Sequence, residues 1–444
     1  MRVAIIGSGP AGFYAAEALL KRTDTTVDLD LFDRLPTPYG LVRGGVAPDH
    51  PKIKSVTRVF ASTAARPTFR FLGNVQLGRD LTVEDLRRHY HQIVYATGNE
   101  TDRRLGIPGE GIVRSTPATV FVGWYNGHPD YRPARFDLSV PRVAVVGNGN
   151  VAVDVARILL RTPPELERTD IAAHALAALR ESRVREVYML GRRGPAQAAF
   201  TPSELEELGK LEDADPMVDP ADLPAAAAGE GRGNLEILRD FAGRTPRPGA
   251  KRLHFRFLVS PTQVLADVQG GVAGLELERN RLEPRGDGSL VAVGTGVREV
   301  IEVGMLLPAV GYAADRIPGV PYDEKRRLIA NDDGRVVDPV TRARMPNEFV
   351  VGWARSGPQG LIGEHKRASA QVVAHMVEDA AGVASRPLPP REAIDALLRE
   401  RGVQLVTFDD WKRLDEVEVA RGARRGAPRE KITDVAAMLE LLRK

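Results

Sequence analysis

The 444-residue sequence contains no cysteine. Without a thiol the chain cannot build a disulfide framework, a redox dithiol, or a zinc or iron–sulfur centre held by cysteine. Any redox chemistry must therefore come from a bound organic cofactor or from a partner protein.

Long hydrophobic runs and a strong net charge are missing as well. No apolar run approaches the ~18 residues of a membrane-spanning helix. Lys and Arg number 62 against 59 Asp and Glu, which argues against nucleic acid as the main partner. The first strand-like segment begins at Arg2 and leaves no room for a signal or transit peptide. We expect a cytoplasmic protein of roughly two to three domains that is not inserted into a membrane.

Two strand–glycine–helix units, residues 3–20 and 142–160, dominate the sequence. The first carries Gly7, Gly9 and Gly12 in the spacing of the dinucleotide-binding fingerprint. In that fingerprint the first glycine allows a tight turn, the second lets a pyrophosphate approach the backbone, and the third lets helix and strand pack closely. The helix N-terminus offers free N–H groups to the phosphates. The alternative is that these glycines serve packing only.

The residue that follows the next strand limits the ligand of the first loop. The strand at 27–32 ends at Asp33, 26 positions after Gly7. A carboxylate there accepts hydrogen bonds from an adenosine ribose and repels a 2′-phosphate. The first loop is therefore predicted to take FAD or NAD rather than NADP.

The second glycine loop, residues 147–152, repeats the fingerprint with alanine in the third glycine position. The next strand, 187–190, lies beyond a polar helical insertion at about 163–180 and is followed by Arg192 and Arg193. Paired guanidinium groups bind phosphate bidentately, which predicts NADP. The alternative is an exposed arginine pair in a loop. Since one chain rarely needs two nicotinamide sites, the first loop is assigned to FAD.

The remaining chain gives weaker signals. Strands are predicted at 92–98, 305–311 and from 348, a helix at about 364–379, a linker at 385–391 and a final amphipathic helix at 431–442. The acidic and Ala-rich stretch 209–233 is interpreted as a surface loop of little order. The C-terminal tail could associate with another copy or touch a partner, but we expect it to pack on the FAD domain.

Several long motifs occur in order over about residues 1–380, and together they resemble the adrenodoxin reductase family. The closest type is the bacterial ferredoxin–NADP reductase of adrenodoxin-reductase form. The motifs are residues 7–14, 38–43, 47–52, 121–126, 147–152, 192–201 and 352–363.

The resemblance implies an α/β fold with two Rossmann-like, three-layer, parallel-sheet domains. The NADP domain, 102–312, would be inserted into an FAD domain made of 1–101 and 313–444. The implied enzyme takes hydride from NADPH to FAD and delivers single electrons to a ferredoxin or adrenodoxin-like iron–sulfur protein. A monomer or weak dimer is expected, without a metal site.

The resemblance also implies which residues contact the cofactors. Those for FAD are Gly7, Gly9, Pro10, Ala11, Gly12, Asp33, Leu41 and Val75, with Trp353, Gly360, Leu361 and Ile362 at the isoalloxazine end. Those for NADP are Asn148, Gly149, Asn150 and Val151 at the pyrophosphate, Arg192 and Arg193 at the 2′-phosphate, and Glu204 on the adenosine side. Gly360 would also approach the nicotinamide.

His50 and Glu207 match a His–Glu pair near the nicotinamide in this family. The pair could act in proton or electrostatic chemistry during flavin reduction, or could only fix loop and domain orientation. Hydride transfer itself needs no side-chain acid, because the cofactors carry the chemistry.

Other functions remain open at this stage. The lack of cysteine excludes disulfide reductases and iron–sulfur relatives, but an NADPH-dependent flavin reductase of quinones or other small oxidants is an alternative, as is a redox sensor with little catalysis. A basic cluster is the candidate docking surface for an acidic ferredoxin, although it could be an ordinary solvated loop. It consists of Arg239, Arg244, Arg247, Lys251 and Arg252.

Overall fold

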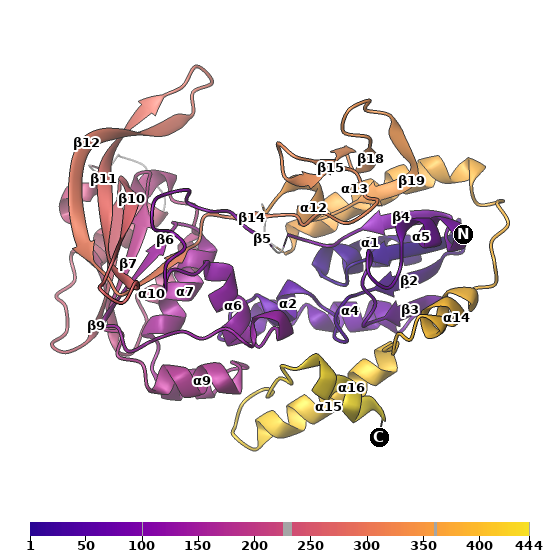
Figure 1. Cartoon of the computed structure of the whole chain (residues 1–444), viewed down its shortest axis with the longest axis horizontal. Coiled ribbons are helices and arrows are strands. Elements are labelled where there is room, and N and C mark those ends of the chain that lie inside the picture. The colour runs from indigo at the N-terminus through magenta and orange to yellow at the C-terminus, as the bar shows by residue number, and fades with distance from the viewer. Residues whose placement is uncertain (100, 225–232, 359–361, 444) are drawn as a thin grey trace.

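The computed structural model describes residues 1–99, 101–224, 233–358 and 362–443, and it shows two lobes built on separate sheets (Figure 1). Each glycine loop predicted above joins a buried parallel strand to a helix in one of these lobes. The α/β class with parallel sheets is therefore confirmed.

The first lobe contains a seven-stranded sheet whose strands come from both ends of the chain. Its order is β17 (Asn331–Asp332), β18 (Arg335–Val337), β19 (Arg344–Val350), β4 (Gln92–Tyr95), β1 (Arg2–Ile6), β2 (Asp28–Phe32) and β3 (Phe69–Leu72). The strands from β19 to β3 are parallel, and β17 and β18 are antiparallel additions. Because β1 is covered on both faces, its residues form a continuous apolar run.

Helices cover both faces of this sheet. The helices of the first lobe and of the C-terminal segment are α1 (Pro10–Leu20), α2 (Leu41–Gly44), α3 (Pro51–Lys54), α4 (Thr57–Ala64), α5 (Val83–His89), α12 (Trp353–Ser356), α13 (Glu364–Glu378), α14 (Ala393–Glu400), α15 (Phe408–Ala423) and α16 (Val435–Arg443). On one face of the sheet, α1, α4 and α13 cover a hydrophobic core. On the opposite face, α5 and α14 cover a second hydrophobic core. Short elements complete the lobe: β15 (Tyr322–Asp323), β16 (Leu328–Ile329) and η4 (Asp379–Gly382).

The second lobe contains a five-stranded parallel sheet in the order β13 (Met305–Pro308), β6 (Arg142–Val146), β7 (Glu186–Gly191), β9 (Lys251–Phe257) and β8 (Ala214–Val218). One face packs on an antiparallel sheet of β10 (Val259–Ala266), β11 (Val272–Pro284) and β12 (Leu290–Glu302). The other face packs on helices. These are α6 (Ala118–Asn126), α7 (Asn150–Leu160), α8 (Pro163–Glu167), α9 (Ala173–Arg180), α10 (Pro202–Leu208) and α11 (Asn234–Ala242), with η1 (Pro129–Tyr131), η2 (Pro195–Gln197) and η3 (Pro220–Asp222).

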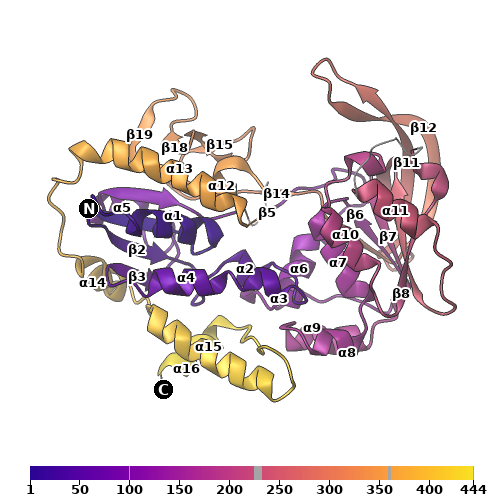
Figure 2. The ribbon, with the colours of Figure 1, turned by 180° about the vertical axis from the view of Figure 1, so that it is seen from behind.

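A short antiparallel pair connects the lobes. It consists of β5 (Thr101–Asp102) and β14 (Tyr312–Ala313), which lie between the two sheets in both views (Figures 1 and 2). The chain therefore crosses between the lobes twice at one place. Among the described residues no helix is both long and apolar enough to cross a membrane.

The predicted surface loop at 209–233 is wrong in part, because residues 214–218 form β8 at the edge of the parallel sheet. Its alternate residues Ala214, Pro216 and Val218 are buried. Pro216 and the acidic residues nearby made this alternation of buried residues hard to recognise in the sequence, but an edge strand tolerates proline. Residues 225–232 of that stretch lie outside the described residues.

The C-terminal segment, residues 408–443, packs on the first lobe as expected (Figures 1 and 2). Trp411 and Met438 join the core of one face of the seven-stranded sheet. The predicted final helix at 431–442 starts later, at Val435, because the Asp434 carboxylate accepts the Ala437 N–H at 2.9 Å and caps the helix there.

Candidate active site

The first glycine loop has the close contacts that its sequence predicts. Gly7 has φ +107°, and a Cβ on it would lie 2.3 Å from the Ala96 carbonyl oxygen. A Cβ on Gly12 would lie 2.1 Å from the Gly7 carbonyl oxygen. Around Gly9, by contrast, no described atom lies within 4 Å of such a Cβ, just before α1 begins at Pro10. The loop is therefore closed against the protein and open where a pyrophosphate would approach.

Asp33 stands at the carboxyl end of β2 and is tied to this loop. Its Oδ2 accepts the Ser8 backbone N–H at 2.9 Å and also the Ser8 hydroxyl. The Val75 N–H donates to the Asp33 carbonyl at 2.8 Å. Leu41 begins α2 next to Gly40, on which a Cβ would lie 2.9 Å from the Gly9 Cα. The predicted adenine and ribityl residues thus gather at one edge of the sheet, where α/β proteins bind ligands.

Trp353, predicted at the isoalloxazine end, begins α12 and packs on the Tyr312 ring at 5.5 Å between centroids. Its indole Nε1 is buried and finds no hydrogen-bond partner within the described residues. Gly352 before it has φ +68°, and a Cβ there would lie 2.5 Å from the Ala11 Cβ. An orphaned buried donor beside the first glycine loop fits a ligand acceptor. Ile362 packs against the core between the seven-stranded sheet and helices α1 and α13. Gly360 and Leu361 lie outside the described residues.

The second glycine loop repeats this geometry. A Cβ on Gly147, at φ +146°, would lie 2.5 Å from a backbone oxygen, whereas one on Gly149 would meet no described atom within 4 Å. Asn150 begins α7 and accepts the Thr201 N–H on its side-chain oxygen at 2.9 Å, with half-buried Val151 next to it. The Asn148 side-chain oxygen is buried and lacks a partner in the described part of the chain.

Arg192 and Arg193 follow β7, and both side chains are exposed. Their backbone is fixed, since the Asn280 side-chain amide donates to the Arg192 carbonyl at 3.0 Å and the Leu258 N–H to the Arg193 carbonyl at 3.2 Å. Neither guanidinium has an ion pair with any described carboxylate. Two positioned and uncompensated guanidinium groups fit a phosphate.

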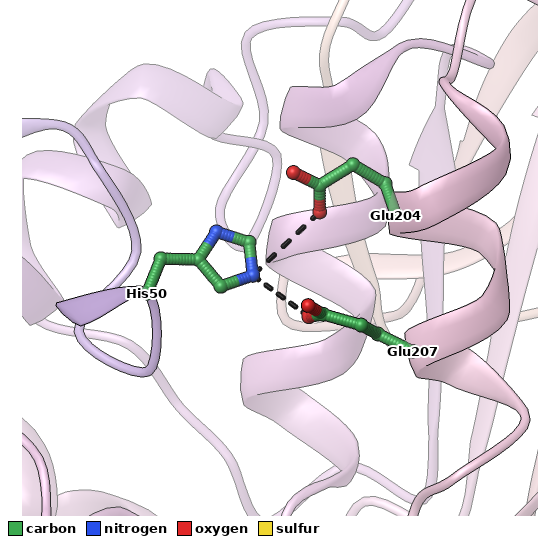
Figure 3. A group of neighbouring side chains, drawn as sticks. All are labelled: His50, Glu204 and Glu207. Carbon is green, nitrogen blue, oxygen red and sulfur yellow. Dashed lines mark hydrogen bonds and ion pairs between the residues drawn. The ribbon is translucent and has the colours of Figure 1, made fainter. Parts of the chain in front are cut away.

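His50 and Glu207 lie together, as expected, where the two lobes meet (Figure 3). The His50 Nε2 lies 2.8 Å from the Glu207 carboxylate and 3.7 Å from that of Glu204. His50 precedes α3, whereas both glutamates come from α10. Glu204 is thus beside His50, and its predicted contact with the adenosine side of NADP stays a prediction.

Sequence reasoning missed the centre of this cluster, the fully buried Arg157. Its guanidinium contacts the Asp49 carboxylate at 2.6 and 3.1 Å, Asp154 at 2.7 Å and Glu204 at 3.2 Å. Asp154 and Arg157 are one turn apart in an otherwise apolar helix, and that pairing was the only local signal.

The close contacts in this cluster shift the pKa values of its ionisable side chains. Burial lowers the pKa of His50, but the hydrogen bond to Glu207 and the charges of Asp154 and Glu204 together outweigh burial, and the net pKa is raised. The same bond lowers the pKa of Glu207. Burial raises the pKa of Glu204, and the neighbouring Asp154 adds to this. Burial also disfavours the charge of Asp49, yet Arg157 holds its pKa well below the usual value.

Comparisons with known proteins agree with this geometry. Residues 1–189 match the family described as pyridine nucleotide-disulphide oxidoreductase. The chain is 44% identical to the NADPH-ferredoxin reductase FprA of Mycobacterium leprae, over 99% of this chain and 98% of that protein. It is 42% identical to the human mitochondrial NADPH:adrenodoxin oxidoreductase, over 99% of this chain and 92% of that protein. The solved structure of Mycobacterium tuberculosis FprA in complex with NADPH superposes with a TM-score of 0.95 at 42% identity, covering 100% and 99% of the two chains.

The chain belongs to the adrenodoxin reductase family. Like other family members, it is an oxidoreductase. Because it contains no cysteine, the disulfide chemistry in the name of the broader family cannot take place on this chain.

The basic cluster predicted to dock a ferredoxin on this adrenodoxin reductase family member is largely engaged within the second lobe. Arg247 and Arg252 bind the Asp215 carboxylate at 2.8 and 3.0 Å. Lys251 donates to the Leu160 carbonyl of α7 at 3.2 Å, and Arg239 donates to the Pro224 carbonyl at 3.2 Å. Arg244 lies over the Phe241 ring. Asp215 offsets part of the positive charge, and the docking role of the cluster stays a prediction.

Proposed function

We propose that the chain is an FAD-dependent ferredoxin–NADP reductase. It takes hydride from NADPH and delivers single electrons to a ferredoxin or adrenodoxin-like iron–sulfur protein. The observation that carries the proposal is the contrast between the two glycine loops: Asp33 lies beside one, and Arg192 and Arg193 follow the strand beside the other. The names of the full-length relatives support the same donor and acceptor.

The proposal gives each lobe one cofactor. Residues 1–101 and 313–444 would form the FAD domain, and 102–312 an NADP domain inserted into it, in agreement with the membership of the two sheets. Gly7, Gly9, Pro10, Ala11 and Gly12 would hold the FAD pyrophosphate, with the other predicted FAD residues at the same edge of the sheet. Bound FAD would supply the conversion of a two-electron donor into two single-electron transfers. We further propose that the protein works in the cytoplasm as a monomer or weak dimer.

The NADP side is assigned in the same way. Arg192 and Arg193 would bind the 2′-phosphate, residues 148–151 the pyrophosphate, and Glu204 the adenosine side. Exposed and uncompensated guanidinium groups, together with the open space at Gly149, support this assignment.

His50 and Glu207 would assist flavin reduction by holding positive charge near the nicotinamide. His50→Gln keeps a donor in place but removes the titratable charge, so we expect a several-fold slower flavin reduction by NADPH in single-turnover stopped flow. An unchanged rate would leave the pair only its role in fixing the loop and the lobes.

The deciding experiment is NADPH-driven reduction of cytochrome c by the purified protein, with and without added ferredoxin. A large ferredoxin-dependent rate that is much lower with NADH is expected. A fast rate that ignores ferredoxin would favour a reductase of quinones or other small oxidants, and bound flavin that NADPH fails to reduce would favour a redox sensor.

A further inference from the structure

Arg157 makes contacts in both lobes. From the second lobe it grips the Asp49 carboxylate of the first lobe through Nε at 2.6 Å and Nη2 at 3.1 Å. A bidentate contact of this kind fixes both distance and direction, which a lysine ammonium cannot do.

The same guanidinium also orders the groups around His50. It lies 3.2 Å from Glu204 and 3.7 Å from Glu207, and Glu207 bonds His50 at 2.8 Å. Arg157 therefore reaches the segment before α3 twice, directly at Asp49 and through Glu207 at His50.

The position of Arg157 in its helix gives these contacts a consequence for the cofactors. The helix α7 begins at the second glycine loop, two turns before Arg157. The segment that it grips continues back to α2, where Leu41 lies beside the first glycine loop. The buried Arg157 thus links the loop that would carry NADPH to the segment that would border FAD, and Arg161 of the same helix adds a single contact to Asp49 at 2.7 Å.

We propose that Arg157 is a positioning residue for hydride transfer, which sets the distance between the nicotinamide and the flavin through its fork to Asp49. The inference rests on the proposed function. Misplacement of reacting groups by about 1 Å can cost on the order of 100-fold in rate, so a small loss of lobe alignment should reach the chemical step.

A second ion pair between the lobes supplies the matched control. The Lys54 ammonium binds the buried Asp170 carboxylate of the second lobe at 2.6 Å. Lys431 also binds Asp170, at 3.2 Å, so Lys54→Gln leaves that carboxylate with a partner. This variant weakens a contact between the lobes without touching Arg157.

The test compares Arg157→Lys, Asp49→Asn and Lys54→Gln with the parent flavoprotein. For each, stopped flow gives the limiting rate of flavin reduction and the NADPH concentration that half-saturates it, and the long-wavelength charge-transfer absorption reports nicotinamide stacked on flavin. Amide hydrogen exchange over residues 41–54, measured without NADPH, reports the contact itself. Asp49→Asn, nearly isosteric, keeps the test valid should Arg157→Lys fold poorly.

We expect Arg157→Lys and Asp49→Asn to lose at least about tenfold in limiting rate, to weaken the charge-transfer band and to exchange faster over 41–54, with half-saturation changed by less than about threefold. Lys54→Gln should keep the parent rate. Parent-like rates in both variants, or an equal loss in Lys54→Gln, would overturn the inference. Failure of NADPH to reduce the parent flavin would instead defeat the proposed function, and the exchange data would still show whether Arg157 joins the lobes.

Discussion

Single residues after equivalent strands give the two glycine loops side chains of opposite charge. Asp33 follows β2 and places a carboxylate by the first loop, whereas Arg192 and Arg193 follow β7 and place two exposed cations by the second. The backbone geometry of the loops is otherwise alike, with a glycine at positive φ and an open second glycine in each. In the proposed assignment, the choice between FAD and NADP therefore depends on one or two side chains rather than on the fold.

Replacing both Arg192 and Arg193 by alanine should reduce the preference for NADPH over NADH. Each charge-assisted hydrogen bond contributes about 1.5–3 kcal/mol, so we expect kcat/KM for NADPH to fall by at least ~100-fold while that for NADH changes little. Steady-state kinetics with both donors measures this. Arg183→Ala, at another exposed arginine of the same lobe, is the control. Equal losses with both donors would contradict a role at the 2′-phosphate.

Some site residues could be predicted from the sequence and others could not. The glycines, Asp33 and the arginine pair are defined by their spacing from a strand, which is local information. Arg157 and Asp49 stand 108 positions apart, and only the docking of the two lobes brings them together. A buried ion pair of this kind leaves no periodic pattern in either segment.

At the scale of helices and strands, two glycines of the first glycine loop are needed for different reasons. Gly12 provides room for the protein, because its Cβ would meet a backbone oxygen, whereas a Cβ on Gly9 would meet no described atom within 4 Å, and this is the space proposed for the pyrophosphate.

Gly12→Ala and Gly9→Ala should therefore fail differently. We expect Gly12→Ala to lower the melting temperature of the apoprotein, because α1 and β1 must separate. Gly9→Ala should fold normally but retain little FAD, because its methyl group takes the space of the pyrophosphate. Apoprotein melting curves and the flavin-to-protein absorbance ratio distinguish the two. A full flavin content in Gly9→Ala would disprove the assignment of that space.

The link between the lobes contains a carboxyl group whose charge opposes folding. Burial raises the pKa of Asp102 in β5 to about 6, against 3.8 for an ordinary aspartate, although the Thr119 hydroxyl donates to it. The folded protein then binds this proton more tightly than the unfolded chain does, so the stability from this group is present below about pH 4 and is lost as the pH rises through 6.

Asp102→Asn should remove that loss. We expect its melting temperature to exceed that of the parent by a margin that grows between about pH 4 and 6 and is constant above. Thermal unfolding of both proteins over this range tests it, and parallel curves for parent and variant would show that Asp102 titrates normally.

There is a physical reason why some strands could be predicted from the sequence and others could not. The buried parallel strands are continuous apolar runs, which the sequence shows directly. The antiparallel sheet of β10 to β12 was not predicted. The β12 segment is rich in valine, but it is largely exposed and two glycines, Gly294 and Gly296, interrupt it, so it shows no continuous apolar pattern.

Across the whole molecule, the lobes and the C-terminal segment meet at one buried carboxylate. Asp170, of the second lobe, binds Lys54 of the first at 2.6 Å and Lys431 of the C-terminal segment at 3.2 Å. Burial lowers the pKa of Lys431 to about 7, so the charged form of this lysine is disfavoured in the folded protein. The two lysines lower the pKa of Asp170 to about 2 although burial acts in the opposite direction.

Asp170→Asn and Lys431→Met should accordingly have unequal effects on stability. Removing the carboxylate leaves buried positive charge without compensation, and we expect a loss of about 3–5 kcal/mol. Lys431→Met keeps one lysine for one carboxylate and should change stability by no more than about 1 kcal/mol. Urea unfolding at pH 7 measures both, and similar losses would show that Lys54 alone does not compensate the Asp170 carboxylate.

The seven-stranded sheet also has a consequence for synthesis on the ribosome. Strand β4 is made by residue 95, but its neighbour β19 is not complete until residue 350. All strands of the second lobe, up to Pro308, emerge in between. The nascent first lobe therefore carries an open β4 edge throughout that interval, and such an edge readily pairs with other chains. The chain is consequently exposed to misassembly during translation until β19 has emerged.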